Sequence, residues 1–176
     1  LGPQHMRHPQ AEILTTLAPA FDAYGAENIE PTLDALATAG ESGAAPAEIS
    51  ALDASALSAI AAASAAANPT LKEKILAAAK TLTVAGDEYS VAVENDAIVN
   101  LHEYHDAFGF IATAISDLKL LSGADESERN AIKTAIEQAE VAATAAPSIH
   151  PPTSGFKPAS IIYGAAARIE IAARGL

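Results

Sequence analysis

The sequence predicts an all-α protein: an up-down helical bundle of five to seven helices with one long central helix. Half of the 176 residues are apolar but only 5% are aromatic, and most apolar residues are alanine, the strongest helix former. Large apolar side chains recur three or four residues apart, which is the spacing of one helix face. No segment shows the alternation of a strand. Because alanine buries little area, the core must depend on close helix contacts and a few large anchors.

The chain is expected to divide into three parts. They are a cloning remnant over 1–6, a helical bundle over 7–146, and a proline-rich loop plus C-terminal helix over 147–176 that packs on the same domain. The apolar spacing predicts helices that begin near Ala11, Glu30, Ser50 or Asp53, Thr70, Glu88, Asp125 and Pro158.

Helix ends in the first half follow from local signals. Gly25 ends the first predicted helix. Gly40–Pro46 is a loop by composition and separates the second helix from the third. Asn68-Pro69 ends the third helix, and Thr70 can cap the fourth.

The segment 88–121 is the strongest predicted helix. An apolar seam runs along it through Val91, Ile98, Leu101, His105, Phe108, Ile115 and Leu118. Gly109 lies in this seam, where it indicates a close approach or a bend. Ser122-Gly123 ends the helix, and the next one opens with acidic residues that suit its N-terminal dipole.

Composition excludes several classes of function. The net charge of -12 argues against nucleic acid and anionic membrane surfaces as partners. Cysteine is absent, so thiolate chemistry and disulfides are excluded. No glycine-rich phosphate loop or nucleophile elbow is present, and we therefore expect no enzyme activity and no cofactor. No apolar stretch reaches about 18 uninterrupted residues, so no transmembrane segment is expected.

One cluster carries possible metal ligands. In LHEYHDAF, His102, His105 and Asp106 are i, i+3 and i+4 neighbours on a helix, with Glu103 between them. Two imidazoles and a carboxylate could converge on a divalent cation. The spacing is neither that of the zincin pair nor the Glu-x-x-His pattern of di-iron bundles. A metal-binding bundle that uses His102 and His105 is therefore an alternative function. The other interpretation is structural: His105 packs in the apolar seam and His102 lies beside it.

Binding of an apolar ligand is the leading functional interpretation. Large side chains opposite alanines can pack tightly or leave an elongated apolar cavity. Its expected lining is Leu101, Phe108, Ile111, Ile115, Ile132 and Ile136. The other alternative is a structural or scaffold protein, such as a virion, appendage or envelope component, whose helices form homo-oligomers.

The order of features resembles a known family, the fungal hydrophobic surface binding protein A and related cell-wall mannoprotein lipid-binding domains. The compared layout covers roughly 11–146 and includes the proline-started NPTLKEKIL at 68–76 and the helix NLHEYHDAFGFIATAI at 100–115. The segment 147–176 lies outside it. The resemblance implies a secreted or cell-surface protein that binds fatty-acid-like lipids or hydrophobic surfaces without catalysis.

Overall fold

The computed structural model describes residues 5–7, 14–24, 26 and 28–176. The predicted helix end at Gly25, the start at Ala11 and most of the expected cloning remnant lie outside these residues. Within them the chain forms seven helices and a two-stranded hairpin, which confirms the predicted all-α class. The helices are α2 (Leu14–Tyr24), α3 (Ile29–Ser42), α4 (Pro46–Ala67), α5 (Leu71–Ala92), α6 (Leu101–Lys119), α7 (Glu126–Ala143) and α8 (Ser160–Ala173).

The chain divides into two compact units, Leu1–Pro69 and Thr70–Leu176. We call the first the N-terminal unit and the second the bundle. The division falls at the Asn68-Pro69 break, where Asn68 takes a left-handed conformation and ends α4.

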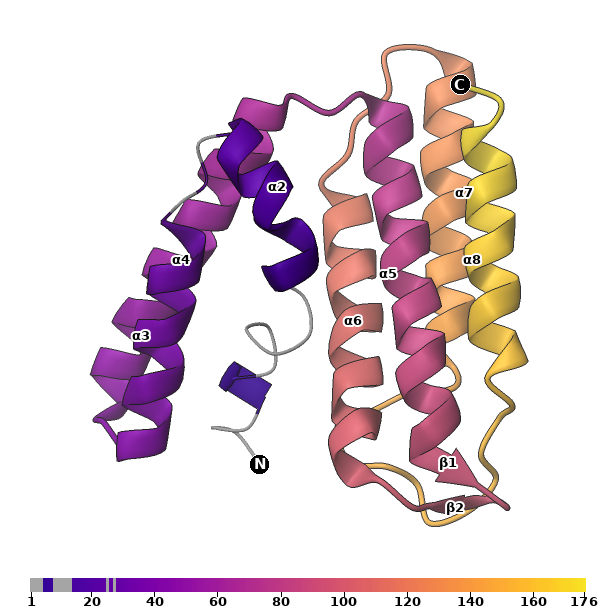
Figure 1. Ribbon diagram of the computed structural model, residues 1–176. Helices are drawn as coiled ribbons and strands as arrows, with labels where there is room; N and C mark the ends of the chain where they lie inside the picture. The colour runs from indigo at the N-terminus through magenta and orange to yellow at the C-terminus, as the bar shows by residue number, and fades with distance from the viewer. Residues whose placement is uncertain (1–4, 8–13, 25, 27) are drawn as a thin grey trace. The chain divides into compact units, whose positions relative to one another are not determined.

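The bundle consists of α5, α6, α7 and α8 in up-down-up-down order (Figure 1). Each helix packs against the next along the chain, and α8 closes the ring by packing against both α5 and α7. Short connections between α5 and α6 and between α6 and α7 favour antiparallel neighbours. The longer segment 144–159 crosses one end of the bundle to reach α8.

Three bundle helices begin at residues that cap them. The Thr70 hydroxyl accepts a hydrogen bond from the Glu73 backbone N–H while the Glu73 carboxylate accepts one from the Thr70 backbone N–H. This capping box holds the pKa of the Glu73 carboxyl below its usual range. Asn100 and Asp125 cap α6 and α7 through their side-chain oxygens. The predicted Thr70 cap is therefore confirmed.

The bundle core combines alanines with a small number of large anchors. The largest fully buried side chains are Tyr89, Tyr104, Ile75, Leu82, Ile111, Leu118, Ile162 and Ile169. Alanines on all four helices surround them, which lets the helix backbones approach closely. The rings of Tyr89 and Tyr104 pack against each other with centroids 6.3 Å apart. Stability thus rests on a few large side chains and many small contacts.

The predicted continuous helix over 88–121 is wrong. The structure ends α5 at Ala92, forms the hairpin of β1 (Val93–Glu94) and β2 (Ala97–Ile98), and starts α6 at Leu101. Asn95 and Asp96 both have positive φ, as a two-residue type I′ turn requires, and these residue types tolerate that conformation. The turn reverses the chain, so one long apolar seam becomes two antiparallel helices.

Close backbone approach occurs at Gly86 rather than at Gly109. A Cβ at Gly86 would lie 2.6 Å from the Tyr163 ring, whereas a Cβ at Gly109 would meet nothing within 4 Å. The ring is held in place because the Tyr163 hydroxyl donates a hydrogen bond to Asp87 at 2.7 Å. The expectation of a close approach at Gly109 is therefore wrong, and the contact between α5 and α8 needs glycine at Gly86.

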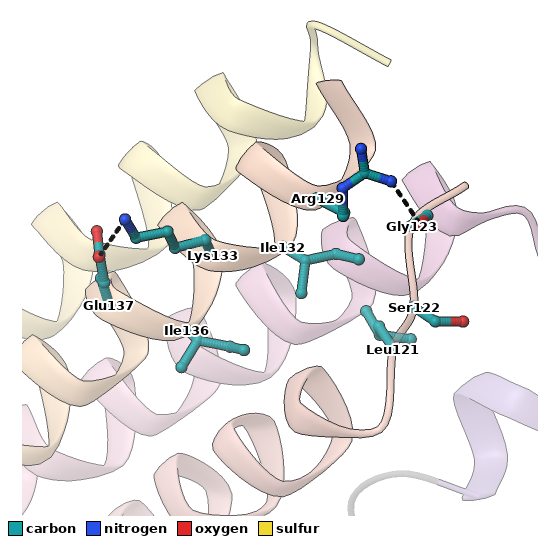
Figure 2. Close-up of a pocket in the computed structure, with 8 residues that line it drawn as sticks. All are labelled: Leu121, Ser122, Gly123, Arg129, Ile132, Lys133, Ile136 and Glu137. Atoms are coloured by element: carbon teal, nitrogen blue, oxygen red, sulfur yellow. Dashed lines mark hydrogen bonds and ion pairs between the residues drawn. The ribbon is translucent and has the colours of Figure 1, made fainter. Parts of the chain in front are cut away.

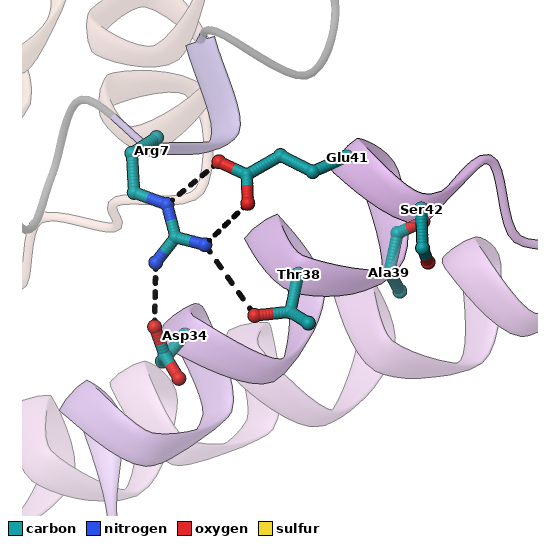
Figure 3. Close-up of polar contacts among 6 residues, drawn as sticks. All are labelled: Arg7, Asp34, Thr38, Ala39, Glu41 and Ser42. Carbon is teal, nitrogen blue, oxygen red and sulfur yellow. Dashed lines mark hydrogen bonds and ion pairs between the residues drawn. The ribbon is translucent and has the colours of Figure 1, made fainter.

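The N-terminal unit contains α2, α3 and α4 and has a small core. Its buried cluster is Leu14, Ala26 and Ile29 among the described residues. Arg7 ties the segment 5–7 to α3, with its guanidinium 2.9 and 2.8 Å from the Glu41 carboxylate oxygens and also paired with Asp34 (Figure 3). This contact lowers the pKa of the Glu41 carboxyl.

Helix α4 is unlike the others in its exposure. It begins with Pro46 in its first turn, earlier than the predicted starts at Ser50 or Asp53. Only Ala56 is buried, while Leu57 and Ile60 are 59% and 43% exposed. Judged by length and composition alone, α4 is long and apolar enough to cross a membrane. It is the one helix among the described residues with this property.

Candidate metal centre

The first turn of α6 positions the candidate ligands. The backbone N–H groups of Val99 and Asn100 donate to the Ala92 carbonyl, which fixes the chain between the hairpin and α6. The Asn100 side-chain oxygen then accepts from the backbone N–H of His102 at 3.1 Å. Its amide nitrogen donates to Glu103 Oε1 at 3.4 Å. One cap residue therefore sets both the helix start and the Glu103 side chain.

The structure brings His102 and Asp106 together. His102 Nδ1 lies 3.4 Å from Asp106 Oδ2 and 4.0 Å from Glu103 Oε1, and the three side chains are 16%, 16% and 21% exposed. Two donors about 2.1 Å from one ion are about 3.0 Å apart at a right angle and about 4.2 Å apart in line. The spacing of His102 with either carboxylate fits a shared cation.

The same geometry supports a second ligand arrangement. At 3.4 Å, His102 Nδ1 and Asp106 Oδ2 are close enough that a small rotation of the ring would direct Nδ1–H at the carboxylate, orient the ring and leave Nε2 as the metal donor. Histidines that bind metals commonly carry such a carboxylate partner. In both arrangements Asp106 is required, either as a ligand or as the group that orients the ligand.

The chain segment that carries the site is rich in carboxylates. Between Lys80 and Lys119 the sequence has no lysine or arginine, while seven acidic residues fall in this stretch. They are Asp87, Glu88, Glu94, Asp96, Glu103, Asp106 and Asp117. A segment with this excess of carboxylates attracts cations and repels anions.

His105 does not join the other two candidate ligands. Its ring packs edge-on toward Tyr104 with centroids 6.5 Å apart. Among the described residues, the ring nitrogens of His105 do not lie with the ligand atoms of His102 and Asp106 in one group that could hold an ion. Sequence reasoning overlooked Asn100, although an asparagine followed by Glu103 three residues later is a helix-start signal.

Two buried tyrosines fix the end of the bundle next to this cluster. The Tyr104 hydroxyl donates to the Ser148 carbonyl at 3.0 Å, and the Tyr89 hydroxyl donates to the Lys157 carbonyl at 2.9 Å. The Phe156 backbone N–H donates to the Asp96 carboxylate at 2.7 Å. Burial raises the pKa of Tyr89 to about 12. These bonds tie the segment 144–159 to the hairpin and to α6.

The predicted apolar lining is spread over different environments. Ile111 is fully buried in the core, Leu101 is 39% exposed, and Phe108 and Ile115 are partly buried against the core. Only Ile132 and Ile136 line the same groove (Figure 2).

That groove lies beside α7 and has a volume of about 460 Å³. Leu121, Ile132 and Ile136 form its apolar side. Its charged side chains are engaged locally: Arg129 donates to the Ala124 carbonyl at 3.1 Å, and Lys133 lies 3.9 Å from Glu137. The groove holds no candidate metal ligand pair like that of α6.

Residues 70–176 form a four-helix bundle, and His102 with Asp106 on α6 is its candidate cation site. A family model described as the iron permease-associated 4-helix bundle domain matches residues 64–174. This match covers more than half of the chain, and the chain therefore belongs to that family. Comparison with curated proteins gives no match, and neither does comparison with solved structures.

The family match corrects the resemblance drawn from the sequence. The chain is not assigned to the hydrophobic surface binding proteins, and the predictions of lipid and hydrophobic-ligand binding are wrong. Alanine-rich helices separated by prolines give similar layouts in unrelated families, which explains the error. The matched region also includes 147–174, which the earlier layout left out.

Proposed function

We propose that the bundle binds iron as cargo and works beside an iron permease in the membrane. The observation that carries this proposal is the pairing of His102 with Asp106 at 3.4 Å, in a chain of the iron permease-associated family. The metal-binding alternative drawn from the sequence is closer to this function than lipid binding.

The small number of donors and the charge of the site support a transfer role. The side chains of His102 and Asp106 are each 16% exposed, while His102 Nε2 and Asp106 Oδ2 are themselves buried, so a side chain must move for a held ion to pass to a partner. A few donors with open positions bind more weakly and exchange faster than a closed four-ligand structural site. Such a site suits cargo that must be passed on. We propose binding and transfer without catalysis.

The location follows from the partner. A domain that serves a permease must meet the membrane, so we propose that the chain acts at a membrane surface, held there by protein contacts. The net charge of -12 disfavours direct binding to anionic lipids. The partner surface on the permease is then expected to be neutral or basic.

The test counts iron bound per chain by equilibrium dialysis, with iron supplied in either oxidation state. Asp106→Asn removes the carboxylate charge at constant shape, and we expect affinity to fall by about 10- to 100-fold. His150→Ala, in an exposed loop, is the matched control and should bind like the wild type. If Asp106→Asn binds as much iron as His150→Ala, the proposed site is wrong.

A further inference from the structure

We propose that the bundle docks on its permease partner through the end that carries the β1–β2 hairpin, and that the matching surface of the partner is apolar and basic. The inference rests on the proposed function for the identity of the partner and adds the face that meets it. It follows from where the exposed apolar side chains and the charges of the bundle lie.

Exposed apolar side chains gather at the hairpin end. Here α5 finishes and α6 begins, and the segment 144–159 crosses the same end (Figure 1). Four large apolar side chains are exposed there, and we call them the hairpin-end patch: Val91, Val99, Leu101 and Ile149. Apolar side chains that are exposed together, and not singly, mark surfaces that contact other molecules.

Three members of the patch lie around one short stretch of backbone. The Val99 backbone N–H donates to the Ala92 carbonyl at 2.9 Å, which places Val99 beside the last turn of α5 and therefore near Val91. Leu101 is the first residue of α6. The patch thus follows from how the hairpin joins the two helices.

The fourth member is held by the bundle core. Ile149 follows Ser148, whose carbonyl accepts a hydrogen bond from the buried Tyr104 hydroxyl at 3.0 Å. Further along the same segment, the Tyr89 hydroxyl donates to the Lys157 carbonyl at 2.9 Å. A surface that is already fixed loses less conformational entropy on binding, which favours docking.

Charge is distributed unequally along the bundle. The segments at the hairpin end, 87–106 and 144–159, contain six acidic residues and one lysine. The segments at the opposite end, 70–74, 117–133 and 168–176, contain six acidic and seven basic residues. A basic surface is therefore attracted to the hairpin end, so that charge orients the approach and the apolar patch supplies the contact.

The same charges argue against two other occupants of the patch. In a symmetric dimer the same surface meets itself, which would bring two acidic ends together. Anionic lipid is repelled in the same way. A partner protein with lysine or arginine around an apolar surface fits both properties of the hairpin end.

The experiment measures binding of the full-length, iron-free protein to the iron permease of the same organism, reconstituted in nanodiscs of neutral lipid. The patch variant carries Val99→Asn and Ile149→Asn. Its matched control carries Leu120→Asn and Ile171→Asn, which change exposed apolar side chains at the opposite end. Circular dichroism confirms that each variant is folded. We expect the patch variant to bind about 10-fold more weakly or worse, and the control to stay within about twofold of the wild type.

A second pair of variants tests the role of charge. Glu94→Lys reverses an exposed charge on the hairpin, and Glu126→Lys reverses one at the opposite end. Glu94→Lys should slow association and reduce its dependence on salt, whereas Glu126→Lys should not slow it.

The outcomes separate the docking face from iron binding. Equal affinities of the patch variant and its control would overturn the docking face. Binding to empty nanodiscs as tight as to the permease, or dimers in light scattering that only the patch variant loses, would assign the patch to lipid or to a second copy and overturn the proposal. A chain that binds iron in dialysis but does not bind the permease overturns the docking face alone. Docking by a chain that binds no iron would overturn the proposed function and leave the docking face standing.

Discussion

The two units of the chain use the same alanine-rich composition and obtain different cores. In the bundle, a continuous buried cluster extends from Ile75 on α5 to Ala173 on α8. In the N-terminal unit the described cluster is Leu14, Ala26 and Ile29, and α4 exposes most of its length. Among the described residues, alanine therefore contributes to a large continuous core where four helices meet around large anchors such as Tyr89 and Leu82.

Helix start signals also differ between the two units. Thr70, Asn100 and Asp125 cap three of the four bundle helices with side-chain hydrogen bonds, whereas α8 in the bundle and α3 and α4 in the N-terminal unit begin without a side-chain cap. A missing cap typically costs about 1 kcal/mol. The comparison indicates that the bundle is the stable framework and carries the site.

The largest expected effect comes from opening the bundle core. Leu82 is fully buried, and Leu82→Ala should lower the free energy of unfolding by about 2–5 kcal/mol. Leu57→Ala on α4, where the side chain is 59% exposed, is the matched change and should stay within about 0.5 kcal/mol. Urea unfolding measures both. Equal losses in the free energy of unfolding would contradict the conclusion that the bundle core is better buried than α4.

Glycine substitutions give the next largest contrast, this time within the bundle. Gly86→Ala places a methyl group 2.6 Å from the Tyr163 ring and should destabilise the bundle by about 1–3 kcal/mol. Gly109→Ala meets nothing within 4 Å on an exposed helix position and should stabilise it by about 0.5–1 kcal/mol. Thermal unfolding of the two variants should shift in opposite directions; a stabilising Gly86→Ala would contradict the close contact of α5 with α8.

The smallest expected effect is on alkaline stability. Burial raises the pKa of Tyr89 from 10.0 to about 12, so the folded state holds the phenol proton more tightly than the unfolded state does. The resulting stability is fully present below pH 10 and is lost as pH rises through about 12. In Tyr89→Phe, the free energy of unfolding should change less between pH 10 and 12 than in the wild type, as measured by urea unfolding at each pH. If Tyr89→Phe loses as much stability as the wild type over this range, another group is responsible.

Much of the fold could be predicted from local signals. Asn68-Pro69, Thr70 and Asp125 mark helix ends and starts that the structure contains. The hairpin was missed because a four-residue pairing has no periodicity to detect, and Asn95-Asp96 was its only turn signal. Gly86 and Gly109 look alike in sequence, and only the packing of α8 against α5 distinguishes them.

The site could be predicted in part. The i, i+4 spacing of His102 and Asp106 was visible, and the structure places their side chains together. The separation of His105 from them depends on its packing toward Tyr104, which spacing does not show. The cluster matches no established metal motif, so its chemistry could not be read from residue spacing; the iron context came from the family match.

Iron binding is proposed for the bundle and not for the N-terminal unit. The most direct test is to measure iron bound per chain for the full-length protein and for the fragment 70–176, with circular dichroism to confirm that the fragment is helical. We expect a folded fragment that binds the same number of ions as the full-length chain, with an affinity within about threefold, and we expect this binding to be lost in Asp106→Asn. A folded fragment that binds no iron, beside a full-length chain that does, would contradict it.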